Sequence, residues 1–476
     1  MANFDLTNLA VKMICPNNVV KTDDTDLPSV LVYIPKFKNS DVLTGGNDST
    51  HPAFIVNGVE IPGFYYGKYQ AKVYNFVAYS LPGEDPTASI NFDTARARCE
   101  AKGAGWHLST NAEWAAIALW CKKNGFLPYG NNNYGKDSRE SNYKAAPSYY
   151  ESGKIARVAT GTGPISWSHD KTMAGIWDLN GNVWEWQGGI RLVWGELQIL
   201  ANNDAADPDN PQNATSTCWK AINAADGALV DPESKTTDSS AHVSGKTVKL
   251  DYVNNKWTYS TSITNAKDES RSCAFYQVAA DSSIGDAAKV MLRTLALLPD
   301  SDVTTDVYEG DYMWWNNGVA ERCVYRGGGW YVGANAGVFY LSGTHSRSNA
   351  DPNIGFRAAC VRFICNSDTL DDLDSDKKQP EPKKRSILAP DFIGRIKQAL
   401  ARQFQKLYEA AHGENPEGFA ELAEKATDEE LAKAAKLSAT LAQVNAAVDM
   451  YELTAKQLKL AATTSITIKT EVNDHE

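Results

Sequence analysis

One stretch of the sequence, residues 329–352, carries most of the side chains whose chemistry could form a site. His345 and Asp351 lie within it, and an imidazole and a carboxylate can serve as a general base or as metal ligands. No cysteine, second histidine or further carboxylate stands beside them at helical ligand spacing, and no nucleophile-elbow motif accompanies them. The interpretation that remains is that both residues contact a ligand.

The rest of this stretch mixes aromatic rings with short hydrogen-bonding side chains. Adaptable binding surfaces use such a mixture, because rigid rings supply contact area and small polar groups supply hydrogen bonds. The residues follow neither a helical nor a strand period, so no single buried face collects them. The sequence therefore predicts this ligand-binding set: Gly329, Tyr331, Val332, Tyr340, Ser342, Thr344, His345, Asp351 and Pro352.

Residues of a structural kind border this set on both sides. Gly327, Gly328 and Gly333 suit a tight backbone approach or a positive φ. Trp330 offers a large apolar anchor, and residues 354–356 (IGF) predict a buried strand. We therefore expect a fixed frame that holds chemically varied residues.

Charge and composition limit the kinds of partner. The 476 residues have a formal net charge of -11. Proteins that bind nucleic acid or anionic membranes instead use clusters of Lys and Arg. We therefore expect neither partner. No stretch reaches transmembrane length, and the N-terminus lacks a secretory pattern, so we expect cytoplasmic synthesis and no membrane insertion.

Eight cysteines are spread along the chain without CxxC or zinc-finger spacing. Reduced and mostly buried thiols are the interpretation that we favour. Two disulfide bridges, Cys218 to Cys273 and Cys323 to Cys360, are alternatives that the sequence leaves undecided, because it does not fix the pairing.

Runs of β-forming residues indicate where a sheet begins. Residues 30–37 and 59–69 are rich in β-branched and aromatic types, and Asn57-Gly58 predicts a hairpin turn before the second run. From about 193 to 317 the chain is more polar. We interpret that region as a large insertion that carries a hairpin over 247–263 and a helix over 286–298.

Two short helices are expected between these regions. Asp93 can cap a helix that ends near Gly103. Thr110 and Glu113 then form a capping box, with Trp114 on the apolar face of the second helix.

The two ends of the chain differ from the middle in composition. Residues 1–27 form a short polar arm, and residues 366–385 are a charged linker with an acidic run followed by a basic one. Residues 386–476 carry apolar residues at helical spacing. We interpret them as a helical tail, which forms either an intrachain hairpin or a coiled coil between copies of the chain.

Three motifs together resemble a known family. Residues 106–114 (WHLSTNAEW), 177–186 (WDLNGNVWEW) and 326–357 are similar to the formylglycine-generating-enzyme-like branch of the C-type lectin fold. The resemblance covers residues 28–365. It implies an α+β C-type lectin fold with a large insertion, followed by an α-helical C-terminal region. Residues 325–362 look most like the variable proteins of diversity-generating retroelements, including phage receptor-binding proteins.

In such systems, adenine-directed mutagenesis rewrites asparagine-type codons. Every member of the ligand-binding set is a residue type that changes at the adenines of AAC or AAT can produce. Lys, Glu, Gln, Met and Trp cannot arise in this way, and none belongs to the set. Asn335, Asn349 and Asn353 are either unmutated or constrained, and both interpretations stay open.

The resemblance also raises an enzymatic alternative, a copper-dependent oxidase of the formylglycine-generating type. Such an enzyme needs cysteine thiolates, which are soft ligands for copper. By alignment on the glycine pair and on residues 355–357, these would fall near Val332 and Gly337, and neither is a thiol. The HxxxHxE spacing of related sulfoxide synthases is absent as well. We therefore expect that the chain is not an enzyme.

Related enzymes hold a structural calcium at the second motif through side-chain and backbone oxygens, which suit that ion. The resemblance places it at Asn180, Gly181, Val183 and Glu185. In the alternative, Asn180 makes a turn and Glu185 a buried hydrogen bond. No cofactor is required in either case.

Together these features predict a ligand-binding display protein whose surface is diversified by a retroelement. We expect the receptor-binding protein of a phage tail, located in the virion, with a cell-surface protein or glycan as its ligand. Several copies joined by the tail would strengthen weak sites. The alternative is a variable lectin displayed on a bacterial surface, or a cytoplasmic protein. A calcium-dependent sugar lectin is not indicated, because the binding stretch has no EPN or QPD motif.

Overall fold

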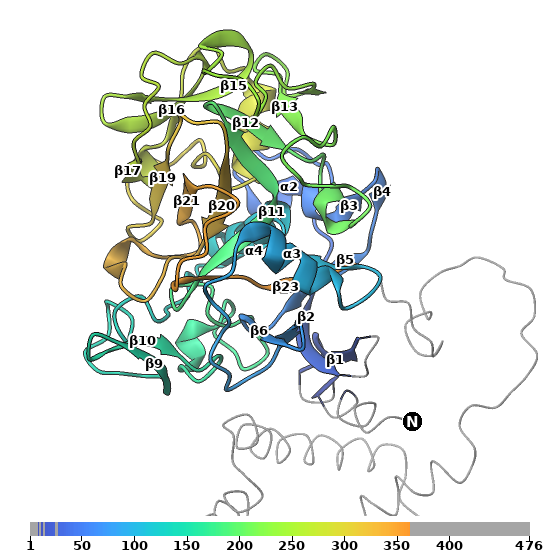
Figure 1. Cartoon of the computed structure of the whole chain (residues 1–476), viewed down its shortest axis with the longest axis vertical. Coiled ribbons are helices and arrows are strands. Elements are labelled where there is room, and N and C mark those ends of the chain that lie inside the picture. The colour runs from blue at the N-terminus through green and yellow to red at the C-terminus, as the bar shows by residue number, and fades with distance from the viewer. Residues whose placement is uncertain (1–7, 9–10, 13–14, 24–26, 362–476) are drawn as a thin grey trace, which may run out of the picture. The chain divides into compact units, whose positions relative to one another are not determined.

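The computed structural model describes residues 8, 11–12, 15–23 and 27–361 (Figure 1). The charged linker, the helical tail and the oligomer contacts expected there lie outside the described residues. The described part is mostly β with few helices, which is consistent with the lectin-like fold that the motifs imply. None of its helices is long and apolar enough to cross a membrane.

A five-stranded sheet joins the two ends of the described chain. Its strands are β1 (Asn18–Thr22), β2 (Pro28–Pro35), β5 (Gly63–Gly67), β23 (Ala358–Cys360) and β8 (Trp106–Leu108), in that order. The predicted β-rich runs supply β2 and β5. Residues 18–22, which we assigned to the arm, pair with β2. We call residues 326–357 the variable stretch. Because β23 lies between β5 and β8, the segment after this stretch is fixed in the middle of the five-stranded sheet.

The larger sheet carries both the variable stretch and the region interpreted as an insertion. Its main path runs β17-β19-β21-β20-β11-β12-β15-β16-β18. Strands of the insertion thus continue the same sheet on both sides of β11, β20 and β21. The bounds are β11 Trp184–Val193, β12 Glu196–Ile199, β13 Lys220–Ile222, β14 Leu229–Val230, β15 Ser244–Val253, β16 Lys256–Ser262, β17 Arg271–Ala274, β18 Ala279–Ala280, β19 Tyr312–Trp315, β20 Arg322–Arg326, β21 Leu341–His345 and β22 Ile354–Gly355.

Hairpins and short helices complete the described part. The hairpins are β3 (Ile55–Val56) with β4 (Val59–Glu60), β6 (Ala71–Tyr74) with β7 (Val77–Ser80), and β9 (Pro147–Glu151) with β10 (Lys154–Val158). The helices are α2 Asn39–Val42, α3 Phe92–Glu100, α4 Asn111–Lys123 and α5 Asp286–Thr294, with 3-10 turns η1 Pro52–Phe54, η2 Ile165–Trp167, η3 Asp204–Ala206, η4 Phe275–Gln277 and η5 Gly333–Asn335. Figure 1 shows the β15–β16 hairpin of the large sheet at the top of the picture and the separate β9–β10 hairpin at the lower left of the coloured part.

Most predicted local elements are confirmed. The Asn57-Gly58 turn joins β3 to β4, the predicted hairpin of the insertion is β15–β16, and α5 begins at the expected residue. Thr110 and Glu113 form the expected capping box of α4. The cap expected at Asp93 is wrong, because the extended backbone at Asn91 lets its side chain accept the bond from Thr94 N instead.

Two disulfide alternatives are excluded. In the described part of the chain, Cys218, Cys273, Cys323 and Cys360 form no disulfide bond. Cys323 and Cys360 are buried, and Cys323 lies within the large sheet whereas Cys360 lies within the five-stranded sheet. The expectation of reduced, mostly buried thiols is therefore confirmed for the described cysteines.

Candidate ligand-binding surface

The variable stretch begins at a buried arginine followed by a turn. Arg326 Nε donates to Asn111 Oδ1 at 2.8 Å, and its Nη2 donates to the backbone oxygens of Leu295 and Ala296. Burial lowers the pKa of Arg326 to about 9. Gly327 and Gly328 follow with φ of 89° and 85°, a region that residues with a Cβ rarely adopt. This end of the stretch is therefore fixed by α4 and by the segment after α5.

The other end is fixed by a second buried arginine. Arg357 forms an ion pair with Glu185 and donates from Nη1 to Gly67 O at 2.9 Å. The guanidinium thus ties the segment before β23 to β11 and β5. Ile354 and Gly355 form the short parallel strand β22 beside the start of β11. The predicted frame is present on both sides.

Trp330 and Tyr331 are neighbours in the sequence, but the first is buried and the second is exposed to solvent. Trp330 is buried against Ala156 and Val183. Tyr331 is 47% exposed, and its hydroxyl accepts a hydrogen bond from Asn353 Nδ2 at 2.6 Å. The bond joins the two ends of the variable stretch and gives Asn353 a structural reason to stay an asparagine.

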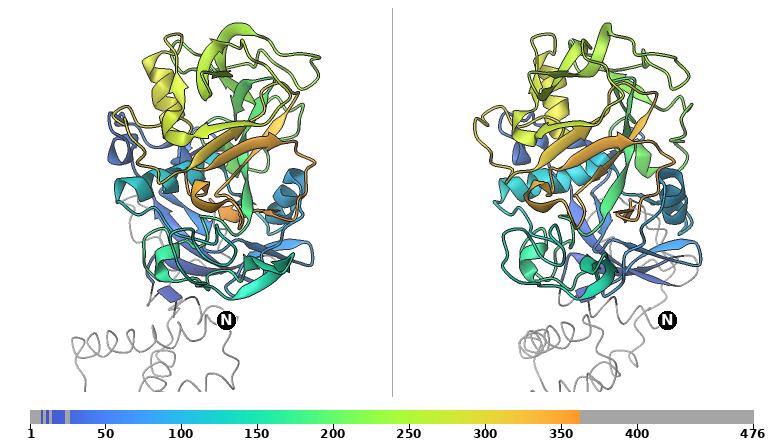
Figure 2. Two further views of the ribbon diagram at one scale, coloured as in Figure 1. Left: turned by 90° about the vertical axis from the view of Figure 1, so that its left-hand side faces the viewer. Right: turned by 60° about the vertical axis from the view of Figure 1, so that its left-hand side comes forward.

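A row of directly paired residues crosses the centre of the large sheet. Ser272, Trp314, Ser342, Tyr325 and Trp186 stand opposite one another on β17, β19, β21, β20 and β11. Residues paired in this way share one face of a sheet. Burial decreases along the row from Trp186, which is fully buried, to Trp314 and Ser272, which are partly exposed. Figure 2 shows these strands side by side.

Hydroxyl groups and an aromatic stack connect this row to the predicted residues of β21. Tyr325 Oη lies 2.7 Å from Thr344 Oγ1, which lies 3.0 Å from Ser342 Oγ. The ring of His345 stacks on that of Tyr325, with centroids 5.2 Å apart and planes at 12°. Three members of the predicted set are therefore organised around Tyr325, which we had not assigned to it.

His345 and Asp351 are brought together across the loop that follows β21. His345 Nε2 and Asp351 Oδ2 are 3.5 Å apart, and both side chains remain partly exposed. Burial lowers the pKa of His345, and the charge of Asp351 opposes this shift without reversing it. The imidazole is thus a neutral contact group near pH 7 with a hydrogen-bonding face that a ligand can reach.

The loop between these two residues has an ionic anchor. Arg347 Nε and Nη2 contact the two carboxylate oxygens of Glu321 at 2.7 and 2.8 Å, and Nη1 contacts Asp93 Oδ1 at 2.8 Å. A bidentate pair fixes the orientation of a guanidinium as well as its position. Arg347 therefore holds the loop in place although it lies within the variable stretch.

The structure separates the predicted set into two groups. Six residues are partly or largely exposed, and three are buried. Exposed or partly exposed are Tyr331, Val332, Thr344, His345, Asp351 and Pro352, whereas Gly329, Tyr340 and Ser342 are buried. Tyr340 packs against Trp184, with ring centroids 4.6 Å apart. Its burial differs from our expectation that Tyr331, Tyr340 and His345 form one solvent-facing patch.

Sequence reasoning missed part of this surface. Tyr312 and Trp314 are partly exposed on β19 and pack against the same cluster as Val332. The alternation of residues 312–315 (YMWW) was the available signal, since Tyr312 and Trp314 share a sheet face while Met313 and Trp315 are fully buried on the other. We had assigned that segment to the polar insertion.

The residues assigned to calcium already have hydrogen-bond partners within the protein. Asn180 Nδ2 donates to Pro128 O at 2.9 Å, and Glu185 is engaged by Arg357 through both carboxylate oxygens. The backbone oxygens of Gly181 and Val183 face the amide nitrogen of Gln70. The alternative, a turn at Asn180 and a buried hydrogen-bonded Glu185, describes this motif.

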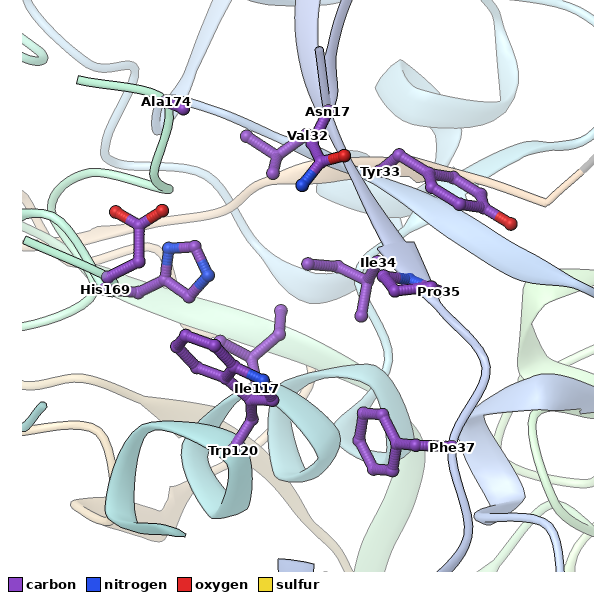
Figure 3. Close-up of a pocket in the computed structure, with 11 residues that line it drawn as sticks. Asn17, Val32, Tyr33, Ile34, Pro35, Phe37, Ile117, Trp120, His169 and Ala174 are labelled. Atoms are coloured by element: carbon purple, nitrogen blue, oxygen red, sulfur yellow. The ribbon is translucent and has the colours of Figure 1, made fainter. Parts of the chain in front are cut away.

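A separate cavity of about 170 Å³ lies between β2 and α4 (Figure 3). Its lining includes Val32, Ile34, Ile117, Trp120 and His169. Burial lowers the pKa of His169 to about 4, and its Nδ1 accepts a hydrogen bond from Ile176 N at 2.8 Å. The imidazole is thus a neutral part of the core, and none of the lining residues belongs to the variable stretch.

No protein-family model and no curated protein matches the sequence. Solved structures that are similar to this chain include variable proteins. The Major Tropism Determinant U1 variant is 10% identical over 70% of this chain, with a TM-score of 0.24, and this chain spans 63% of its length. Treponema denticola variable protein 1 is 12% identical over 72% of this chain and 99% of its own, with a TM-score of 0.26. The Major Tropism Determinant I1 variant is 11% identical over 72% of this chain and 71% of its own, with a TM-score of 0.24.

Proposed function

We propose that this chain is a non-enzymatic display protein whose variable stretch binds a ligand on a cell surface, as the receptor-binding part of a phage tail. The observation that supports the proposal is the difference in burial between the ends of the variable stretch and the residues between them. Arg326 and Arg357 at its ends are fully buried and tied to distant elements. Tyr331, His345 and Asp351 between them reach solvent.

This contrast favours diversification by a retroelement. Exposed side chains away from caps, special backbone angles and buried networks can be exchanged at a cost within about 0.5 kcal/mol. Exchange at the frame would unpair buried charges and is far more costly. A stretch built in this way can change its contacts while it keeps its fold.

The chemistry of the surface favours binding over catalysis. His345 and Asp351 form a pair, but the neighbouring hydroxyls of Ser342 and Thr344 bond to each other and to Tyr325 and not to the imidazole. The nearest cysteine in sequence, Cys323, is fully buried, and burial raises its pKa far above the ordinary value. A thiolate for copper would therefore form only at a high energetic cost.

The ligand that we propose is a protein or glycan on a cell, bound by several copies of the chain at once. Individual sites with exchangeable contacts are expected to be weak, and simultaneous engagement of several copies increases the overall binding strength. Attachment to a phage tail would supply such copies. Display on a bacterial surface would supply them as well and is the second location that we consider.

A matched pair of libraries tests the binding surface. In the full chain displayed on yeast, one library randomises Tyr331, Thr344, His345, Asp351 and Pro352, and the other randomises five buried residues. We expect the first library to keep folded display and to yield binders to hen lysozyme, used here as a model protein. The buried set comprises Trp114, Tyr325, Trp330, Tyr340 and Phe356. Equal loss of folded display in both libraries contradicts the proposal.

Two further measurements address diversification and catalysis. The DNA around the gene is expected to hold a reverse transcriptase gene and a repeat of the codons for 326–357 that differs mainly at adenines. Purified protein is expected to bind no copper at stoichiometric levels and to consume no oxygen with a thiol substrate. Stoichiometric copper with oxygen uptake would support the oxidase alternative instead.

A further inference from the structure

Four oxygen atoms converge on one nitrogen in the interior of the protein. Gln70 Nε2 lies 2.8 Å from Val183 O, 3.1 Å from Asp178 O and 3.3 Å from Gly181 O. It also lies 3.1 Å from Glu185 Oε1. All five residues are buried. Three backbone carbonyls and one carboxylate thus surround a single point, which we call the oxygen cage.

An amide group fills this cage incompletely. Its nitrogen carries two hydrogens, so it can make two good hydrogen bonds, whereas four acceptors face it. Carbonyl and carboxylate oxygens arranged around one centre are the ligand set that hard divalent cations prefer. The distances of 2.8 to 3.3 Å suit hydrogen bonds, and calcium would require roughly 2.3–2.6 Å.

Neighbouring residues hold the amide in this orientation and balance the charge of the cage. Asn182 Nδ2 donates to Gln70 Oε1 at 2.9 Å, which directs the Gln70 nitrogen toward the four oxygens. Arg357 contacts both oxygens of Glu185 and so supplies the positive charge that a cation would otherwise provide. Two side chains therefore stand where one ion would: the Gln70 amide lies at the centre of the cage, and the Arg357 guanidinium lies at its edge.

We propose that the side chain of Gln70 takes the position of a divalent cation, and that shortening it by one methylene group converts the cage into a calcium site. Aspartate at position 70 would withdraw from the centre and leave room for an ion between its carboxylate and the four oxygens. It would also add the negative charge that offsets Arg357. The natural chain, with glutamine in place, folds without this ion. This inference rests on the cage alone and does not depend on the proposed ligand-binding function.

Thermal unfolding of the full chain tests the proposal with an isosteric pair, Gln70→Asp and Gln70→Asn. The natural chain is expected to have the same Tm in EDTA and in millimolar calcium. Both variants should unfold at a lower temperature than the natural chain in EDTA. Calcium should raise the Tm of Gln70→Asp by at least about 5 °C, as expected for a ligand that binds only the folded state. It should leave Gln70→Asn unchanged, because that variant lacks the added charge.

Terbium luminescence gives a second measurement that does not depend on stability. Trp177 and Trp184 flank the cage in sequence and can sensitise a bound terbium ion. Emission is expected from Gln70→Asp and from neither the natural chain nor Gln70→Asn. A natural chain that loses stability in EDTA and regains it with calcium would overturn the proposal. So would a Gln70→Asp chain that binds neither ion, or one that stays unfolded in calcium.

Discussion

Arg357 and Glu185 form a two-point ion pair inside the protein. Guanidinium Nε lies 2.8 Å from Oε2, and Nη2 lies 2.7 Å from Oε1, with both side chains almost wholly shielded from solvent. Burial acts to lower the pKa of Arg357, but Glu185 more than offsets it and the pKa is raised. The pair fixes the end of the variable stretch to the first residues of β11.

Breaking this pair should destabilise the fold strongly. We expect Arg357→Met to lower the free energy of unfolding by about 3–5 kcal/mol, because the Glu185 carboxylate is left buried without its partner. Urea denaturation measures the change. Arg96→Met is the matched control, since Arg96 pairs with Glu100 near the surface of α3 and should cost less than about 1 kcal/mol. Similar losses in both variants would contradict this account.

Truncation of two tyrosines, Tyr325 and Tyr331, should destabilise the fold to very different extents. Tyr325→Ala is expected to cost about 3–5 kcal/mol, because the ring is buried against Trp184 and Trp186. Tyr331→Ala should cost less than about 1 kcal/mol, because the ring is half exposed and loses one exposed hydrogen bond to Asn353. Chemical denaturation of both variants provides the comparison. A Tyr331→Ala loss as large as that of Tyr325→Ala would place Tyr331 in the core.

Alanine substitutions at two glycines distinguish the cost of backbone strain from the cost of steric overlap. Gly333 has φ of 74° and open space where a Cβ would be, so Gly333→Ala should cost about 1–2 kcal/mol from the left-handed backbone alone. Gly328 has φ of 85°, and a Cβ there would lie 2.5 Å from Ala336 Cβ. Gly328→Ala should therefore cost about 1–3 kcal/mol more than Gly333→Ala. Differential scanning calorimetry at one pH tests the order, and equal Tm values would refute it.

Two buried histidines should make the fold sensitive to acid. Burial lowers the pKa values of His51 and His169 to about 4, below the unfolded value near 6.5. The unfolded chain therefore takes up protons first as pH falls. Stability is full above about pH 6.5 and is lost as pH falls toward 4, by about 3 kcal/mol per histidine at most.

The measurement is urea denaturation of the natural chain and of His51→Gln at pH 7.0, 5.5 and 4.5. The variant starts lower, because His51 accepts a hydrogen bond from Ala53 N and contacts Thr294 O. Its loss of stability between pH 7.0 and 4.5 should be smaller than that of the natural chain, since one titrating group is gone. Parallel losses would show that His51 does not carry the acid sensitivity.

Signals between near neighbours in the sequence predicted many of the local elements. The Thr110 and Glu113 box, the Asn57-Gly58 turn and the start of α5 each depend on a few consecutive residues, so no distant contact is needed to identify them. Signals that depend on packing were less informative. The alternation of residues 312–315 indicates a strand, but it does not show that this strand pairs with β21, because strand pairing joins residues that are distant in the chain.

The sequence by itself determined the two ends of the variable stretch, since the glycine pair, Trp330 and the IGF strand limit the backbone and the core through their own shape. Only the tertiary structure decided which residues between them face solvent. Tyr331 is half exposed, whereas the ring of Tyr340 is buried because it packs against Trp184 of a distant strand. It also decided that Gln70 and Arg357 occupy the oxygens of the second motif. Whether a side chain is exposed or paired depends on what the fold places beside it, and residue type and local spacing do not specify that neighbour.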